Sequence, residues 1–133
     1  MVRIPIRIEH TYSRTGKHHR MSLLLLINPG GGMVIPDPRE LKPCRGVYIN
    51  GFAYCGEYSI PRGYIAVSIY ITYGLSGRNR GYISILNDGG YEVLRLKYVN
   101  NTMRKVSGDD RYKSYALIAL NNIHRIDEYA KHR

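Results

Sequence analysis

The segment Tyr64-Ile-Ala-Val-Ser-Ile-Tyr-Ile-Thr-Tyr73 decides the fold, because its apolar residues recur at every second position. In an extended chain, successive side chains point to opposite faces, so the aliphatic residues of this segment share one face. They are Ile65, Val67, Ile69 and Ile71. The period therefore predicts a strand over residues 64–73 that buries one face in the core.

Residues typical of turns bound this strand and recur through residues 46–99. These turn signals are Asn50-Gly51, Pro61-Arg-Gly63, Ser76-Gly-Arg-Asn-Arg-Gly81 and Asn87-Asp-Gly-Gly90. Turns at such intervals between alternating segments are typical of antiparallel strands that follow one another in a sheet. The pattern predicts a meander with strands over residues 46–50, 52–60, 64–73, 81–86 and 91–99.

Two further strands are expected before this meander. Aliphatic residues alternate with Arg3, Pro5 and Arg7, which predicts a strand over residues 2–9. Because proline has no amide hydrogen for the ladder, Pro5 places this strand at a sheet edge. A run of leucines predicts a second strand over residues 21–28 that is buried on both faces.

The hydrophobic period changes near the C-terminus. Ser107-Gly-Asp-Asp110 resembles a helix N-cap, and apolar residues then recur at spacings of three and four. This pattern predicts a helix over about residues 109–130. A single amphipathic helix after several strands is expected to lie across the isoleucine face of the sheet.

The predicted fold class is α+β and mainly β, in a single domain over residues 1–133. The sheet is an antiparallel meander of six to eight strands that forms a curled sheet or a partly open barrel, with one C-terminal amphipathic helix packed on it. A chain of 133 residues is long enough to bury one core but short for two domains.

The composition is basic and rich in tyrosine. The formal net charge is +10, and the chain has 13 tyrosines, one phenylalanine and no tryptophan. Such a charge favours a polyanionic partner, either nucleic acid or anionic lipid, although a basic surface can also serve solubility alone. In composition only, the chain resembles small basic proteins of hyperthermophilic archaea and their viruses.

The sequence contains no predicted transmembrane segment and no secretory signal. Its longest unbroken apolar run is Leu23 to Ile27, far short of the roughly 20 residues that cross a bilayer. We therefore expect an intracellular protein, or a virion-associated one if it is viral. Cys44 and Cys55 flank the predicted Asn50-Gly51 turn, where a bridge is geometrically feasible. An intracellular location favours free thiols unless the source is a hyperthermophile.

Motifs for catalysis or metal binding are weak. Pro29-Gly-Gly-Gly32 lacks the following Lys-Ser/Thr of a phosphate-binding loop and is interpreted as a turn. His10, His18 and His19 do not belong to a spaced four-ligand zinc set. His18 or His19 as the general base of a metal-independent nuclease lacks a second positioned acid. No cofactor, metal site or catalytic residue is predicted.

The strand face opposite the isoleucines carries the strongest functional pattern. Tyrosine rings there could stack on unpaired bases, while arginines in the adjoining turns and the basic loop of residues 13–20 hold phosphates. The predicted nucleic-acid-binding residues are Arg14, Lys17, Arg20, Tyr48, Arg62, Tyr64, Tyr70, Arg78, Arg80 and Tyr82.

The leading prediction is a small non-enzymatic nucleic-acid-binding protein, with single strands favoured and RNA or DNA left open. One alternative is a self-assembling structural subunit of a virion or nucleoprotein particle, in which tyrosines form contacts in a homo-oligomer. A small metal-independent nuclease is a further alternative. The fold class alone does not choose among these functions.

Overall fold

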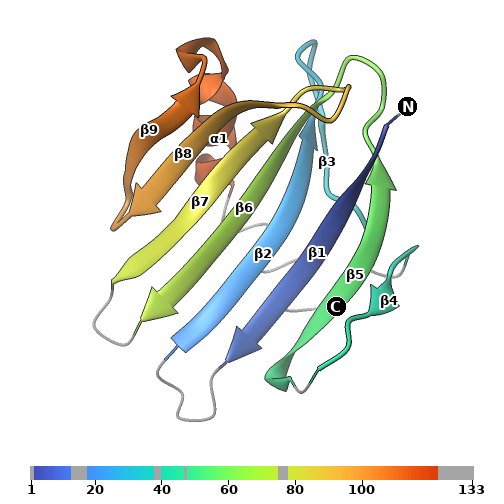
Figure 1. Cartoon of the computed structure of the whole chain (residues 1–133), viewed down its shortest axis with the longest axis vertical. Coiled ribbons are helices and arrows are strands. Elements are labelled where there is room, and N and C mark those ends of the chain that lie inside the picture. Colours follow the sequence, from blue (N-terminus) through green and yellow to red (C-terminus); the bar gives the residue numbers. More distant parts are fainter. Residues whose placement is uncertain (1, 13–17, 38–39, 47, 75–77, 123–133) are drawn as a thin grey trace.

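An antiparallel sheet of nine strands makes up most of the part of the chain that the computed structural model describes, residues 2–12, 18–37, 40–46, 48–74 and 78–122 (Figure 1). A 3-10 turn, Asp110–Tyr112, and one helix, α1 (Lys113–Asn121), follow the sheet. The strands are β1 (Arg3–Tyr12), β2 (His18–Ile27), β3 (Met33–Val34), β4 (Lys42–Pro43), β5 (Ile49–Ser59), β6 (Ile65–Gly74), β7 (Asn79–Leu86), β8 (Glu92–Val99) and β9 (Thr102–Gly108). The predicted class, a mainly β fold with an antiparallel sheet and a C-terminal helix, is confirmed.

The strand order is β4-β5-β1-β2-β6-β7-β8-β9, and β3 pairs with β2 beside this path. The predicted meander is therefore present from β6 to β8 and is extended by β9, and the two strands expected before it, β1 and β2, pair antiparallel. The segment β5 differs, because it pairs with β1 and not with β6. The sheet is open and not a barrel, and the strand number exceeds the predicted six to eight.

The predicted turn at Asn50-Gly51 is wrong, because β5 is one continuous strand over Ile49–Ser59. A Cβ atom placed on Gly51 would lie 2.0 Å from the carbonyl oxygen of His10 on the neighbouring strand. The register of β1 against β5 also shifts between His10 and Tyr12, which marks a bulge there. The glycine therefore permits a close approach of two strands at this bulge and does not reverse the chain.

Strand β9 was not predicted. It follows β8 through a two-residue turn in which Asn100 and Asn101 have positive φ angles of 49° and 68°. Asparagine tolerates this left-handed conformation, which two-residue hairpin turns require. Ser107 and Gly108, expected to begin a helix cap, belong to β9. Asp109 then caps the 3-10 turn, where its side chain accepts a hydrogen bond from the Arg111 amide at 2.9 Å.

The helix α1 packs on the sheet as predicted, but it begins at Lys113 and not near residue 109. Residues 123–130 of the predicted helix lie outside the described residues. Its buried side chains are Ala116 and Ala119, whose small size lets the helix approach β6 and β7 closely. The helix lies behind the sheet in the view of Figure 1. No helix within the described part of the chain is long and apolar enough to cross a membrane.

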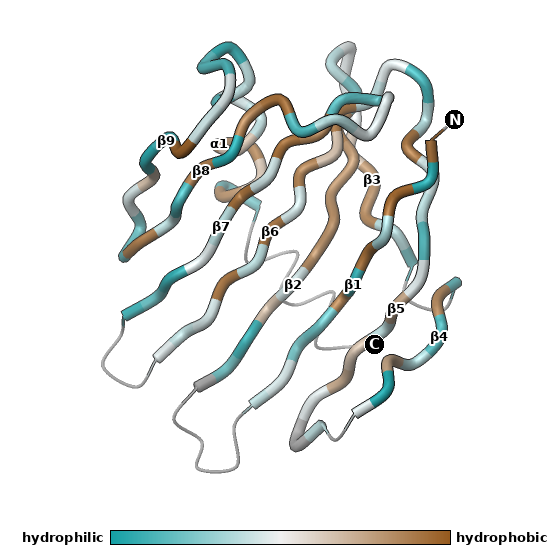
Figure 2. Tube along the Cα trace, in the orientation of Figure 1, coloured by the Kyte–Doolittle hydropathy of each residue, from teal (hydrophilic) through white to brown (hydrophobic). Residues whose placement is uncertain are grey.

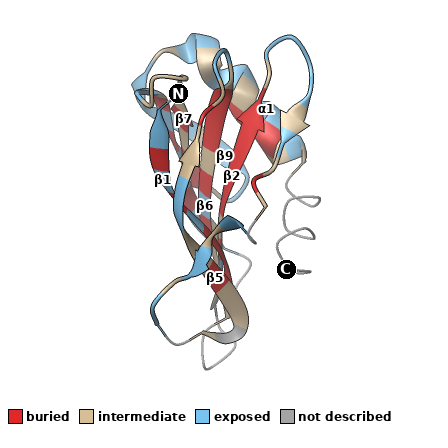
Figure 3. Cartoon of the chain, turned by 90° about the vertical axis from the view of Figure 1, so that its right-hand side faces the viewer, coloured by how far each residue is buried: buried red, intermediate tan, exposed pale blue. Residues whose placement is uncertain are grey.

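Both faces of β2 are buried, as its leucine run predicts. β1 pairs with β2 only at residues 9–12, and its residues 3–8 pair with β5 alone. In side view, β1 lies on one side of β2 and β6, while α1 lies on the other (Figure 3). One core cluster therefore includes Ile4 and Ile6 of β1, Leu24 of β2, and Ala116 of α1. In Figure 2, hydrophobic residues, coloured brown, recur along the strands that contribute to this core.

A disulfide joins Cys44 and Cys55, which corrects the expectation of free thiols. The two residues are not partners across a turn at residue 50. The short strand β4 pairs with β5, and the Cys44 amide donates to the Ala53 carbonyl at 3.0 Å. This pairing brings the two Cα atoms to 5.1 Å, within the normal range for a disulfide. The bridge thus fastens β4 to the edge of the sheet.

We expect the double substitution Cys44→Ser and Cys55→Ser to lower the free energy of unfolding by about 3 kcal/mol, because the bridge closes a loop with a sequence separation of 11 residues in the unfolded chain. Urea denaturation of the oxidised protein and of the variant measures the difference. The wild type with a reducing agent is the matched control and should resemble the variant. Equal stability of the oxidised and reduced wild type would contradict a structural role of the bridge.

Candidate nucleic-acid interface

The face of the sheet opposite α1 carries polar and aromatic side chains from five strands, and we call it the outer face. The strands present it because their buried and exposed residues alternate: the pattern of β7, for example, places Ile83 and Ile85 in the core and the residues between them outside. The register between strands then aligns these outward positions. The outer face comprises Arg20, Ser22, Ser68, Tyr70, Thr72, Arg80, Tyr82, Ser84, Arg95, Lys97 and Arg104.

Tyr70 and Tyr82 form the centre of the outer face. They are direct partners across β6 and β7, strands about 4.8 Å apart in such a ladder. Their exposed fractions are 40% and 46%, although the residues that flank each one along its strand are buried: Ile69 and Ile71 for Tyr70, and Gly81 and Ile83 for Tyr82. Two aromatic faces therefore lie side by side and accessible on rigid central strands.

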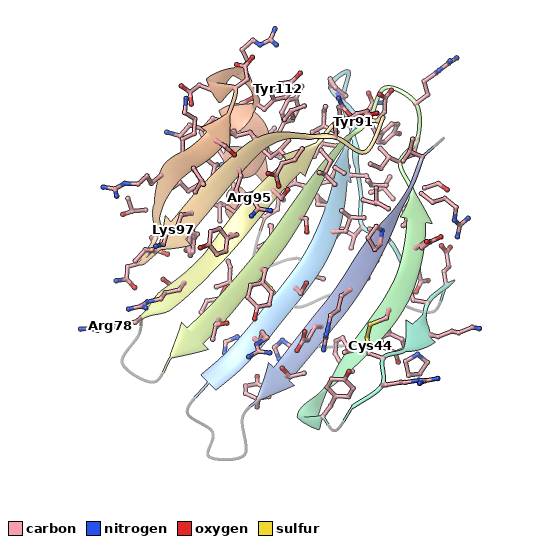
Figure 4. All side chains as sticks on the ribbon, viewed as in Figure 1. Cys44, Arg78, Tyr91, Arg95, Lys97 and Tyr112 are labelled. Atoms are coloured by element: carbon pink, nitrogen blue, oxygen red, sulfur yellow. A yellow bond between two sulfur atoms is a disulfide. The ribbon has the colours of Figure 1, made fainter. Side chains whose placement is uncertain are left out.

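Cationic side chains surround this tyrosine pair. The Cζ atom of Arg20 lies 5.9 Å from the ring centroid of Tyr70, and that of Arg95 lies 5.9 Å from the ring centroid of Tyr82. Lys97 is the partner of Tyr82 across β7 and β8, and Arg104 is the partner of Lys97 across β8 and β9. A row of two tyrosines and two cations thus crosses four strands. Figure 4 shows Arg95 and Lys97 in succession along β8.

The balance of charge differs between the two sides of the sheet. On the β1 and β5 side, Arg3 pairs with Glu57 at 3.4 Å and Arg7 pairs with Glu9 at 2.8 Å. Ion pairs between described residues do not involve the cations next to the tyrosines, apart from Arg95 with Glu92 at 3.1 Å. The cations without such a pair are Arg20, Arg80, Lys97 and Arg104. Among the described residues, positive charge without an ion-pair partner therefore gathers over β2 and β7 to β9.

Three other predicted residues lie away from the tyrosine pair. Tyr64 precedes β6 in a turn, where its amide bonds to the Pro61 carbonyl and its ring packs against the core. The Tyr48 hydroxyl donates to the Arg45 carbonyl at 3.2 Å, before β5 begins. Arg62 is exposed in the turn before β6, at the end of that strand away from Thr72. The predicted place of Tyr48 and Tyr64 on the outer face is therefore wrong, because neither residue belongs to a strand.

The remaining predicted residues divide by position. Arg20, Tyr70, Arg80 and Tyr82 come together on the outer face, and exposed Arg78 precedes β7 beside them (Figure 4). Arg14 and Lys17 lie outside the described residues.

Sequence reasoning missed Arg95, Lys97 and Arg104 as site residues. The alternation of residues 91–99 already placed Arg95 and Lys97 opposite the leucines, so their side of the sheet could have been read from the sequence. Arg104 required strand β9, and the Asn100-Asn101 turn was the signal for that strand. Burial raises the pKa of the Tyr98 phenol, which donates to the Asn101 side chain and fastens this turn to β8.

His10 of β1 and His19 of β2 pack among aromatic rings on the face opposite the outer face. His19 stacks on Tyr73 with centroids 4.3 Å apart, and His10 lies 5.4 Å from His19. The His10 Nε2 atom lies 3.1 Å from the Tyr12 hydroxyl oxygen. Within the described ranges, no group of three His, Cys, Asp or Glu side chains could hold a metal ion.

The glycine segment after β2 is a turn, as expected. The Asn28 amide donates to the Gly32 carbonyl at 3.0 Å, and the Gly31 amide donates to the Asn28 carbonyl at 2.9 Å. The Gly30 amide donates to the Asn28 side chain at 3.0 Å. These amides are therefore engaged within the turn and not directed at an anion.

The outer face combines two chemical abilities. Exposed tyrosine rings can stack on planar groups, and ammonium and guanidinium groups can hold phosphate oxygens. Both abilities come from side chains whose positions are set by β-ladders, so they need no large rearrangement to act together. Comparison with protein-family models, with curated proteins and with solved structures gives no match for this chain.

Proposed function

We propose that the protein is a non-enzymatic binder of single-stranded nucleic acid that uses the outer face of its sheet. The observation that carries this proposal is the exposed pair Tyr70 and Tyr82 on adjacent central strands, bordered by cations of which Arg20, Arg80, Lys97 and Arg104 form no ion pair within the described part of the chain. Bases stacked on aromatic side chains, with basic groups on the phosphates, are the usual basis of single-strand binding by sheets.

A single strand fits this surface better than a duplex. The two rings project from an exposed sheet face, and stacking on them requires base faces that are not already covered by neighbouring base pairs. Duplex recognition through the major groove instead needs a helix or a narrow ribbon that enters the groove. A nine-stranded sheet is too broad for such an entry.

The register suggests how a strand would lie. Lys97 is one strand beyond Tyr82, and Arg104 is two strands beyond it, which corresponds to about 5 and 10 Å across the sheet. Bases over Tyr70 and Tyr82 would therefore have their phosphates toward β8 and β9. The formal net charge of +10 would add general attraction to the polyanion.

We place the protein inside a cell or in a virion, where nucleic acid is available. The disulfide between Cys44 and Cys55 is compatible with an intracellular location in a hyperthermophile, because intracellular proteins of such organisms are often rich in disulfides.

A second candidate function is a structural subunit that assembles through its sheet edge. Among the described strands, β9 pairs with β8 alone, and Val106 on it is 53% exposed, so another strand could be added at this edge. However, Arg104 and Lys105 would bring like charges together in a symmetric edge contact, and a register shift between Arg95 and Leu96 interrupts the ladder. These features are typical of edges that resist pairing, so we favour the nucleic-acid binder.

The measurement of mass in solution separates the two candidates. A monomer that gains mass only with a mixed-sequence oligonucleotide supports the binder, whereas a large homo-oligomer without nucleic acid supports the structural subunit. The nuclease alternative gains no support, because His19, one of its proposed bases, stacks on Tyr73.

Replacing Arg80, Lys97 and Arg104 together with serine is expected to weaken binding and to flatten its salt dependence. If each side chain neutralises one phosphate, the slope of log K against log salt should become shallower by about 2, because each single-strand phosphate contributes about 0.7. Fluorescence anisotropy with a labelled single strand over a range of salt concentrations measures the slope.

The matched control for this variant replaces Lys42 of β4, Arg45 after β4 and Lys113 of α1, which are exposed and lie away from the tyrosine pair. It removes the same net charge but should leave the slope nearly unchanged. Equal changes of slope in the two variants would mean that only total charge matters. Absence of binding by the wild type at low salt would refute the proposed function.

A further inference from the structure

The Glu92 carboxylate lies on the outer face beside Ser84, two residues along β7 from Tyr82, and its position depends on an irregularity in the sheet. Leu94 and Leu96 point into the core, so plain alternation would point Glu92 into the core as well. The register between β7 and β8 shifts at Ile85 and Leu86, which makes Glu92 the partner of Leu86 on the outer face. Such bulges commonly redirect a side chain toward a functional site.

The Glu92 carboxylate is held in place by two neighbours on the outer face. Its Oε2 atom accepts a hydrogen bond from the Ser84 hydroxyl at 2.5 Å and another from Arg95 Nε at 3.1 Å. A second arginine nitrogen, Nη2, also lies 3.1 Å from Oε2. The Oε1 atom accepts no hydrogen bond from the described side chains, so it is available to a ligand.

Arg95 connects this carboxylate to the stacking surface. Its guanidinium lies over the Tyr82 ring, with Cζ 5.9 Å from the centroid, so Arg95 and its partner Glu92 border the face on which a base would stack. The side chain of Arg95 is 47% exposed, and that of Glu92 is 31% exposed. A base stacked on Tyr82 would therefore present its polar edge to the Glu92 Oε1 atom, which can accept a hydrogen bond, and to the N–H donors of Arg95.

We propose that Glu92 and Arg95 select guanine in a single strand whose base stacks on Tyr82; this inference rests on the proposed function. Guanine carries two adjacent donors, N1–H and N2–H, which can both converge on the open Oε1 atom of Glu92, and its O6 atom beside them accepts from arginine. Adenine and cytosine have one amino group next to an acceptor nitrogen, which a carboxylate repels. In uracil, the single N3–H lies between two carbonyl oxygens.

The test compares oligouridylates of about 12 nucleotides that carry guanine, inosine or adenine at one central position. We expect the wild type to bind the guanine strand about 10-fold more tightly than the adenine strand, the scale of one bidentate contact to a base. Inosine, which lacks the N2 amino group, should fall between them. In the variant Glu92→Gln the preference for guanine over adenine should disappear, while binding of plain oligouridylate is retained.

The matched control is Glu57→Gln, which removes the same charge from a carboxylate that pairs with Arg3 on the far side of the sheet. It should keep the guanine preference. Equal binding of the guanine and adenine strands by the wild type, or a preference that survives in Glu92→Gln, would overturn the inference and leave the proposed function intact. Failure of the wild type to bind any of the strands would instead refute the proposed function.

Discussion

Replacing Tyr70 and Tyr82 together with alanine is expected to weaken single-strand binding about 100-fold or more. Truncation of one stacking aromatic typically costs about 1 to 3 kcal/mol per base, so two such losses amount to about 2 to 6 kcal/mol, with about 4 kcal/mol at the middle of that range. The melting temperature should change little, because both rings are substantially exposed. Fluorescence anisotropy and thermal denaturation measure the two effects on the same protein samples.

Two further double variants distinguish the contribution of aromatic stacking to binding from that of side-chain volume. Phenylalanine at residues 70 and 82 keeps the planar faces, so it should retain most of the affinity. Leucine at the same positions restores apolar bulk without a planar face and should bind as weakly as alanine. Unfolding of the alanine variant, or dissociation of an oligomer with unchanged binding per subunit, would show that the tyrosines serve packing or assembly.

Gly81→Ala is expected to lower the free energy of unfolding by about 3 kcal/mol or more, at the upper end of the range for overpacked sites. Gly81 is buried in β7, opposite Ile71. A Cβ atom there would lie 1.8 Å from the Tyr70 carbonyl oxygen and 2.9 Å from the Ile71 Cα atom. These are backbone atoms, so β6 and β7 would have to separate. Urea denaturation measures the loss.

The control for Gly81→Ala is Gly30→Ala in the exposed turn after β2. The nearest atom to a Cβ there is the Asn28 Oδ1 atom at 3.5 Å, an ordinary contact. Its effect should stay below about 1 kcal/mol. Similar losses of unfolding free energy in the two variants would show that β6 and β7 can separate at little cost in free energy. Gly81 precedes Tyr82 in β7. Single-strand binding by the variant should therefore fall in proportion to the fraction of molecules that is unfolded.

Local periodicity in the sequence was enough to predict the strands that build the centre of the sheet. In β6, Ile69 and Tyr70 point to opposite faces because backbone geometry alone alternates side chains. The same rule placed Tyr82 outside and predicted the burial of β2 on both faces. These features depend on the nearest residues in the chain, so they could be read without knowing the partners of each strand.

Turn-forming residues were weaker predictors of structure, because the same residue type can either reverse the chain or allow two strands to approach closely. Gly51 and Gly81 were both interpreted as parts of turns, yet each lies inside a strand where the neighbouring backbone leaves no room for a Cβ atom. Asn100 and Asn101, by contrast, do form the turn that introduces β9. Whether a glycine or asparagine reverses the chain depends on the strand beside it.

The sequence by itself determined the fold class, the buried faces and the exposure of Tyr70 and Tyr82. Only the tertiary structure decided that β5 pairs with β1, that Cys44 meets Cys55, and that Arg104 joins Lys97 beside the tyrosines. It also decided that a register shift turns Glu92 outward. The physical reason is that alternation is a property of each strand alone, whereas pairing and register depend on residues far apart in the chain.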